Sequence, residues 1–231
     1  VNAPGITFID DNNTGIYSPG ADQVAISTNG TGRLFIDSFG RIGIGKGNNS
    51  SYDSIAQNLL VADESGNAGI TIRSGGGSPF GAIHFADGTS SNAEKRAGRI
   101  YYQHALDALV FSTADNEAMR IDSLGRLLLG TTTEGYAAYA DNLTISDSGD
   151  CGMTIRSGTS NQGNIYFSDG TSGSDEYEGI IQYLHNDDAM AFGVNNGSER
   201  MRIDSSGNVG IGTSSPGANL EIKATSVPVI R

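Results

Sequence analysis

The sequence predicts an all-β fold with little helix: an elongated, repetitive, intertwined homotrimeric β-fibre of the β-prism or β-spiral type. Three observations favour it. A short hairpin block recurs three times, polar and apolar residues alternate in short runs between glycine-containing turns, and large apolar side chains are thinly spread. Gly makes up 33 of 231 residues, about twice its average share, while aromatic residues are 7% and Trp is absent.

The hairpin block has an Ile-Asp-Ser step, a glycine turn and a short strand. Its copies are RLFIDSFGRIGIG at 33–45, RIDSLGRLLLG at 120–130 and RIDSSGNVGIGT at 202–213. Asp and Ser bond their own backbone in turns, and Gly adopts positive φ cheaply. In the last strand Val209 and Ile211 share one face, while Gly210 and Gly212 leave room for another backbone. An isolated hairpin is marginal in water, so each block needs a partner surface.

A longer repeat surrounds the block. Three pairs of equivalent residues are each 82 positions apart: Phe85 and Phe167, Met119 and Met201, Asp122 and Asp204. The first copy is shorter. We therefore expect a first β cassette at 1–47, a second at 48–131, a third at 132–213, and at 214–231 a C-terminal extension or the start of a further segment. Each cassette is expected to hold about five short strands.

Helix is expected only in short pieces. Ser91 to Glu94 fits a capping box, in which a serine hydroxyl and a glutamate satisfy the first free N–H groups of a helix. Residues 53–60 and 136–140 are two further short candidates. Dipeptides such as Asp87-Gly88 and Asp169-Gly170 predict turns between strands.

Each cassette has too few apolar side chains to cover both faces of a sheet. A single-chain solenoid or three chains wound about one axis would both solve this problem. A repeat of about 82 residues is long for one solenoid coil, and Gly43, Gly45, Gly210 and Gly212 suit the close approach of chains at an axis. We therefore prefer the trimer. Its candidate core residues are Phe8, Ile36, Phe85, Met119, Ile121, Phe167, Met201 and Ile203.

Charge and composition exclude several functions. The net charge is −12 and the pI about 4.5, so no nucleic-acid partner is expected, because phosphate binding needs clustered basic residues. No apolar run is long enough for membrane insertion. The lone Cys151 excludes a disulfide framework within the chain. Because the first residue is Val, we expect a fragment or a processed product.

No cofactor, metal or catalytic residue is expected. GRIGIGK at 40–46 imitates the start of a P-loop, but the same frame reads GRLLLGT and GNVGIGT in the other copies, which indicates a structural hairpin. The acid pairs, such as Asp187 and Asp188, are more typical of solvated loops than of a glycosidase. The histidines lack metal-ligand spacing. Calcium at the acidic stretch 169–178 is the weaker alternative to a solvated turn.

Aromatic residues beside amides are the better candidates for receptor contact, because aromatic faces stack on sugar rings. They are Tyr101, Tyr102, His104, Tyr183 and His185. The alternative is that about half of them simply pack within the protein.

The blocks GIYSPGADQVAIST at 15–28, RLFIDSFGRIGIG at 33–45 and MRIDSSGNVGIGTSSP at 201–216 resemble those of tail-fibre proteins of tailed bacteriophages, notably marine cyanophages. In that family such repeats precede an endosialidase-type chaperone domain. The resemblance implies a homotrimeric virion appendage, assembled in the host cytoplasm, whose partners are other virion tail proteins and a host cell-surface glycan or protein. The chain ends at 221–231 (EIKATSVPVIR) without the chaperone domain, as a fragment or a trimmed product would.

The function we expect is therefore structural and receptor-binding, in a tail fibre that mediates host attachment without enzymatic activity. Two alternatives stay open. One is a polysaccharide-degrading tailspike, and the other is the stalk of a trimeric bacterial surface adhesin.

Overall fold

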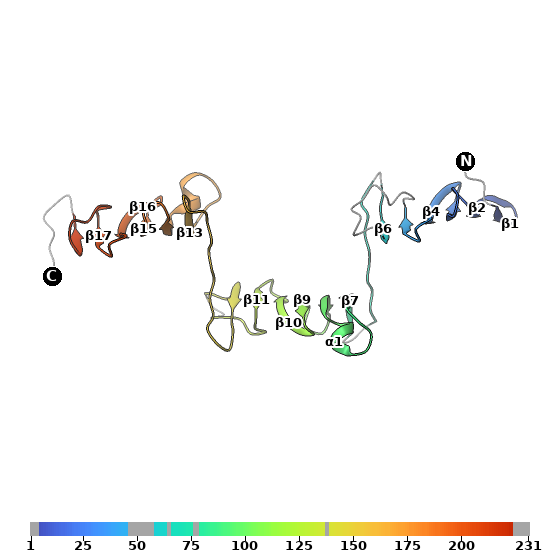
Figure 1. Ribbon diagram of the computed structural model, residues 1–231, viewed down its shortest axis with the longest axis horizontal. Helices are drawn as coiled ribbons and strands as arrows, with labels where there is room; N and C mark the ends of the chain where they lie inside the picture. Colours follow the sequence, from blue (N-terminus) through green and yellow to red (C-terminus); the bar gives the residue numbers. More distant parts are fainter. Residues whose placement is uncertain (1–4, 46–57, 64–65, 76–78, 137–138, 224–231) are drawn as a thin grey trace. The chain divides into compact units, whose positions relative to one another are not determined.

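A computed structural model describes residues 5–45, 58–63, 66–75, 79–136 and 139–223. Within them the chain forms three six-stranded sheets, each from strands that are consecutive in the sequence (Figure 1). The all-β prediction is confirmed. The chain divides into two units, Val1–Ser146 with the first two sheets and Asp147–Arg231 with the third.

The first sheet contains β1 (Ile6–Phe8), β2 (Asp11–Tyr17), β3 (Val24–Thr28), β4 (Thr31–Ile36), β5 (Ile42–Ile44) and β6 (Leu59–Val61). The second contains β7 (Phe80–Phe85), β8 (Gly98–Gln103), β9 (Ala108–Thr113), β10 (Asn116–Ile121), β11 (Leu127–Leu129) and β12 (Leu143–Ile145). The third contains β13 (Gln162–Phe167), β14 (Gly179–Leu184), β15 (Ala189–Val194), β16 (Ser198–Ile203), β17 (Val209–Ile211) and β18 (Leu220–Ile222).

All three sheets share one topology. The first five strands form an antiparallel meander, and the sixth strand pairs parallel with the fifth. Each sheet thus has six strands where the sequence suggested about five. The sixth strands, β6, β12 and β18, lie after the hairpin blocks with which the predicted cassettes end.

The predicted hairpins are the antiparallel pairs β4–β5, β10–β11 and β16–β17. At each turn an aspartate Oδ1 accepts two backbone N–H groups. For Asp122 the donors are Leu124 (2.9 Å) and Arg126 (3.0 Å); Asp37 and Asp204 make the same pair of bonds. The Asp-Ser-Gly signal therefore predicted the turn for the correct reason.

The prediction that the strand glycines allow separate chains to approach at an axis is not supported. Gly212 has a φ of +73°, and a Cβ there would overlap the carbonyl oxygen of Lys223, directly after β18; Gly45 and Gly130 are equivalent. The backbone that approaches so closely is that of the chain's own sixth strand. Gly43 and Gly210 pair with Phe35 and Arg202, on the opposite face from Ile42 and Ile211. Glycine spacing is therefore no evidence for a three-chain axis.

The capping box is confirmed at α1 (Asn92–Lys95). Ser91 Oγ accepts the Glu94 N–H at 3.1 Å, while the Glu94 carboxylate accepts the Ser90 N–H at 2.8 Å. In the third sheet the 3₁₀ helix η2 (Gly173–Tyr177) occupies the same place between strands and was not predicted.

The other helix candidates are not helical where the structure describes them. Residues 53–57 of the candidate at 53–60 lie outside the described residues, and Leu59–Val61 is β6. In the candidate at 136–140, Tyr136 and Ala140 form an isolated antiparallel bridge, and residues 137–138 are outside the described part.

Candidate functional site

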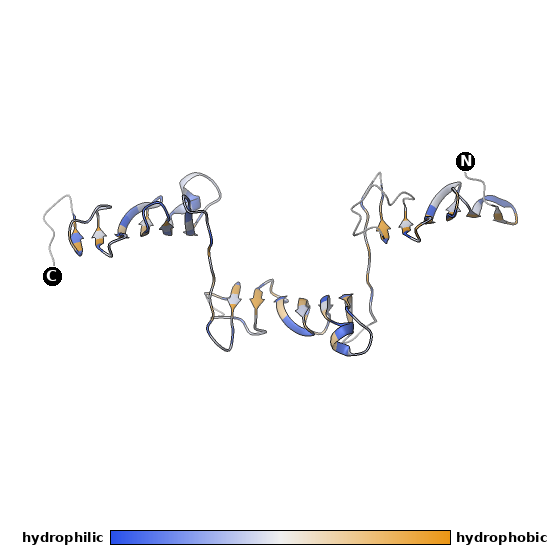
Figure 2. Cartoon of the chain, viewed as in Figure 1, coloured by the Kyte–Doolittle hydropathy of each residue, from blue (hydrophilic) through white to orange (hydrophobic). Residues whose placement is uncertain are grey.

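One face of each sheet carries an unbroken row of apolar side chains across all six strands. Because directly paired residues share a face, the register defines this row, which we call the central apolar rung. Its members are Ile6, Ile16, Ile26, Leu34, Ile44 and Val61; Ile83, Ile100, Phe111, Met119, Leu129 and Ile145; and Ile165, Ile181, Phe192, Met201, Ile211 and Ile222. Figure 2 shows hydrophobic residues on the strands of each sheet.

None of the eighteen rung residues is buried, so each sheet leaves its own rung at least partly exposed. Ile6 is 68% exposed, Ile83 50% and Ile165 40%. A second apolar row runs beside each rung; in the third sheet it is Tyr183, Met190, Ile203, Val209 and Leu220. Contiguous exposed apolar surface of this kind marks an interaction site in soluble proteins. We call this side of each sheet its apolar face.

The predicted core residues lie mostly on these faces. Cross-strand pairing places seven of them there: Ile36, Phe85, Met119, Ile121, Phe167, Met201 and Ile203. Phe8 is at the end of β1, where the register shifts between Thr7 and Phe8, and it is 68% exposed.

The opposite face of the second and third sheets carries arginine–carboxylate pairs, and we call it the polar face. The buried residues of these sheets also lie on it, and they include apolar ones such as Val110 and Leu128. Arg202 bonds both carboxylate oxygens of Glu199, at 3.0 and 2.9 Å, and its partner across the strands is Ala191, which is fully buried. In the second sheet, Arg120 and Glu117 are paired in the same way beside buried residues of β9 and β11. Thus the described residues that are buried beside these arginines range from Ala191 to the larger Val110 and Leu128.

The five candidate receptor contacts do not form one surface. The rings of Tyr102 and His104 make an edge-on contact with their centroids 5.1 Å apart, and those of Tyr183 and His185 make the same contact with centroids 5.0 Å apart. Both tyrosines lie on the apolar faces, paired with Leu109 and Met190. Tyr101 lies on the polar face, because neighbouring residues of a strand point to opposite sides; there it contacts Phe80 and Arg99.

The two Tyr–His pairs are locally ordered. Tyr102 and Tyr183 donate hydrogen bonds to Asp107 and Asp188 at 3.2 and 3.3 Å. Desolvation raises the pKa of both phenols, and the negative charge of the neighbouring aspartate raises it further. Both phenols are therefore neutral hydrogen-bond donors at physiological pH.

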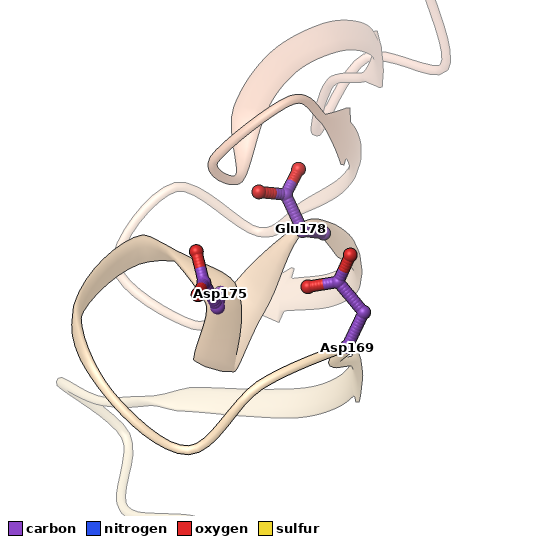
Figure 3. Close-up of side chains that lie close together, drawn as sticks. All are labelled: Asp169, Asp175 and Glu178. Atoms are coloured by element: carbon purple, nitrogen blue, oxygen red, sulfur yellow. The ribbon is translucent and has the colours of Figure 1, made fainter.

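Three carboxylates meet at one end of the third sheet (Figure 3). Asp169 follows β13, Asp175 is in η2, and Glu178 precedes β14; their oxygens lie within 4.8 Å of one another. Oxygen ligands suit a hard cation, but Ca²⁺ takes about 6–8 of them. Asp169 and Asp175 are exposed to solvent, so this trio on its own is an incomplete site.

The P-loop-like stretch forms a hairpin. Gly40 closes the turn and Ile42–Ile44 is β5, while Lys46 lies outside the described residues. Of the acid pairs, Asp187 and Asp188 are in the β14–β15 turn, where Asp187 pairs with Arg202 at 3.2 Å and Asp188 with Tyr183.

Sequence reasoning missed a polar cavity of about 460 Å³ on the polar face of the third sheet, beside the start of β13 and the end of β14. Six of its seven lining residues are polar. A position-by-position comparison of the second and third cassettes would have revealed it, because the polar residues are not repeated.

No known family profile matches the chain, and no curated protein sequence matches it. Within the described residues, no helix combines the length and the apolar character needed to cross a bilayer.

Proposed function

We propose that this chain is a structural and receptor-binding segment of a bacteriophage tail fibre, working without enzymatic activity as a homotrimer that attaches the virion to the host surface. The observation that carries the proposal is the uncovered apolar face of all three sheets. Three sheets with the same topology each carry a six-residue apolar rung that is at least partly exposed, as expected of a repetitive shaft that is completed by other copies of itself.

Identical chains provide matching faces at every level of such a shaft. The rungs repeat along the chain, so parallel copies in register set each apolar face against its counterpart in the other copies. Two copies packed face to face would also cover the rungs. The resemblance of the repeats to trimeric tail fibres favours three copies, with the rungs toward the common axis and the arginine-lined polar faces outward.

Assembly also explains how weak contacts attach a virion. Three identical binding surfaces on one shaft raise the effective affinity far above that of one surface. A trimer carries three times the charge of −12 per chain, and this negative charge keeps neighbouring fibres soluble and apart.

Cell binding tests the proposal. Fluorescently labelled chain is incubated with marine cyanobacteria, the hosts of the phages that it resembles, and bound protein is measured by flow cytometry. The trimer is expected to bind at least one strain saturably. An Ile181→Asp variant, which places a charge in the central apolar rung, should be monomeric and bind about 100-fold less tightly, because avidity is lost. Equal binding by monomer and trimer, or release of reducing sugar ends from the cells, contradicts it.

A further inference from the structure

We propose that the polar cavity of the third sheet binds a neutral saccharide, and that this sheet is therefore the receptor-contacting level of the shaft. The inference rests on the function proposed above and adds to it a site and a ligand class. The polar residues that line the cavity are Ser160, Asn161, Gln162, Asn164, Asn186 and Asp187. Its volume of about 460 Å³ is within the usual range of small-ligand sites.

The walls are held in place before any ligand arrives. The loop before β13 and the turn after β14 are joined by two hydrogen bonds, from His185 N to Asn161 O at 3.2 Å and from Asn186 Nδ2 to Ser160 O at 3.4 Å. Arg202 fixes the Asp187 carboxylate at 3.2 Å. A site ordered in this way loses little entropy on binding.

The second sheet shows that the fold does not require these polar groups. Its strands have the same register, since Phe80 pairs with Gln103 where Gln162 pairs with Leu184. At the positions equivalent to five of the polar residues the second cassette has Pro79, Phe80, Ala82, Ala105 and Leu106. The apolar rungs are kept in both sheets, while five positions of this corner change from apolar to polar and one, from Gln103 to Leu184, changes the other way. The fold therefore does not require the polar residues at these five positions.

Of the three buried side-chain atoms that lack a hydrogen-bond partner within the described residues, one belongs to a residue that lines the cavity. Asn164 Oδ1 is inaccessible to solvent and accepts no hydrogen bond from the described residues. Leaving a buried acceptor unsatisfied is unfavourable, and Asn164 is one of the residues that line the cavity. The equivalent residue in the second sheet is Ala82, where no such acceptor exists.

The lining chemistry favours a neutral, polyhydroxylated ligand. Carboxamides both donate to and accept from hydroxyl groups, the Asp187 carboxylate accepts from them, and Leu184 provides an apolar contact. No lining residue is basic, and Arg202 is already engaged by Glu199 and Asp187. Together with a net charge of −12, this disfavours acidic sugars.

The test uses the full 231-residue chain and saturation-transfer difference NMR. The probes are glucose, galactose, mannose, N-acetylglucosamine, maltose and lactose, with glucuronic acid as the acidic counterpart. We expect saturable binding of at least one neutral sugar. The variant Gln162→Phe, Asn164→Ala, Asp187→Leu introduces residues that the second sheet accommodates, so it should fold and bind at least tenfold more weakly. Asn164→Ala alone serves if the triple variant does not fold.

The matched control is Gln103→Leu, which lies at the position of the second sheet equivalent to Leu184 and introduces the residue found there in the third sheet. It should leave binding unchanged. Absence of saturable binding by every neutral sugar, equal binding by the triple variant, or tighter binding of glucuronic acid overturns the proposal. Mass measured on the same samples separates the two proposals. A trimer without sugar binding refutes only the saccharide site, and a monomer with variant-sensitive binding refutes only the trimer.

Discussion

A single carboxylate organises each of the three hairpin turns. Asp37, Asp122 and Asp204 each accept two backbone N–H groups with one oxygen, and a side-chain donor with the other: Arg41 at 2.6 Å, Arg126 at 2.7 Å and Asn208 at 3.2 Å. The complete set of bonds is formed by the ionised carboxylate, in which both oxygens accept. Protonation of these three aspartates therefore weakens the hairpin turns directly.

All three aspartates have a lowered pKa, for different leading reasons. The Arg126 side chain is the main cause at Asp122, and the Asn208 backbone N–H at Asp204. At Asp37 burial, the largest single influence, raises the pKa, but the combined hydrogen bonds of Arg41 and Phe39 outweigh it. A lowered pKa stabilises the folded state above the ordinary value of 3.8, and this stabilisation is lost as pH falls below it.

Acid unfolding should thus depend on these turns. We expect the thermal midpoint of the protein to fall steeply as pH is lowered from 4 to about 2, and to fall less in the variant Asp37→Asn, Asp122→Asn, Asp204→Asn, whose side-chain oxygens still accept backbone bonds without titrating. The midpoint is followed by circular dichroism. Asp150→Asn, at an exposed position, is the control. Identical pH profiles for the triple variant and the natural chain would falsify this role.

Substitutions at two glycines of the second sheet distinguish the cost of a positive φ from the cost of a close contact with the sixth strand. Gly125 and Gly130 both have positive φ, +79° and +70°, but only at Gly130 would a Cβ overlap a carbonyl oxygen, that of Ser146. Gly125→Ala should lower the free energy of unfolding by about 1–2 kcal/mol. Gly130→Ala should lower it clearly more, because it also pushes β12 away from β11. Urea denaturation of both variants measures this, and equal losses contradict the close approach.

At the scale of elements, sequence reasoning succeeded where signals are local. The hairpins and α1 were predicted because Asp, Ser and Gly act within a few residues. The sixth strands were missed because each has three residues and pairs in parallel with a strand from which 8 to 14 intervening residues separate it, so no local pattern marks it. Gly212 signalled a close approach, but the sequence does not say whose backbone approaches.

The polar face has an energetic role of its own within each chain. Arg202 has a side-chain exposure of 14% and Glu199 of 23%, and the pair has bidentate geometry. Such a half-buried pair is expected at the upper end of the range of about 0.2–1 kcal/mol that exposed pairs contribute. It also shields Ala191 from solvent.

A double-mutant cycle measures that pair. Unfolding free energies of Arg202→Ala, Glu199→Ala and the double variant should give a favourable coupling of about 1 kcal/mol. The coupling should persist in 0.5 M salt better than that of an exposed pair, because partial burial limits screening. Additive single-variant effects, with no coupling, argue that the two side chains only cover the sheet.

At the scale of the whole molecule, strand register decided what the sequence could not. The alternation of polar and apolar residues predicted that Ile, Phe and Met side chains share one face of each strand. Only the strand pairing shows that six of them, one from each strand, form a single row. The same register places Tyr102 and Tyr183 on the apolar faces, so in a trimer they lie nearer to the subunit contacts than to a receptor. The polar cavity was not predicted because its residues come from two segments about 20 residues apart in the sequence, the start of β13 with the loop before it and the end of β14 with the turn after it.

Neighbouring residues of β14 test which face meets other copies. Ile181 is in the central apolar rung, and Gln182 points to the polar face. Ile181→Asp should dissociate the assembly, because three carboxylates would be buried near the axis. Gln182→Asp should leave it intact. Sedimentation velocity distinguishes the two species, and dissociation by Gln182→Asp alone would assign the contact to the wrong face.

The mass of the unmodified chain in solution, measured by light scattering coupled to size exclusion, tests the central claim most directly. If the apolar faces are covered by two further copies, the particle has three times the chain mass of 24.0 kDa, about 72 kDa, and keeps this mass on dilution to nanomolar concentration. A stable, folded particle of 24 kDa contradicts the account, because the rungs would then be tolerated in water without any partner.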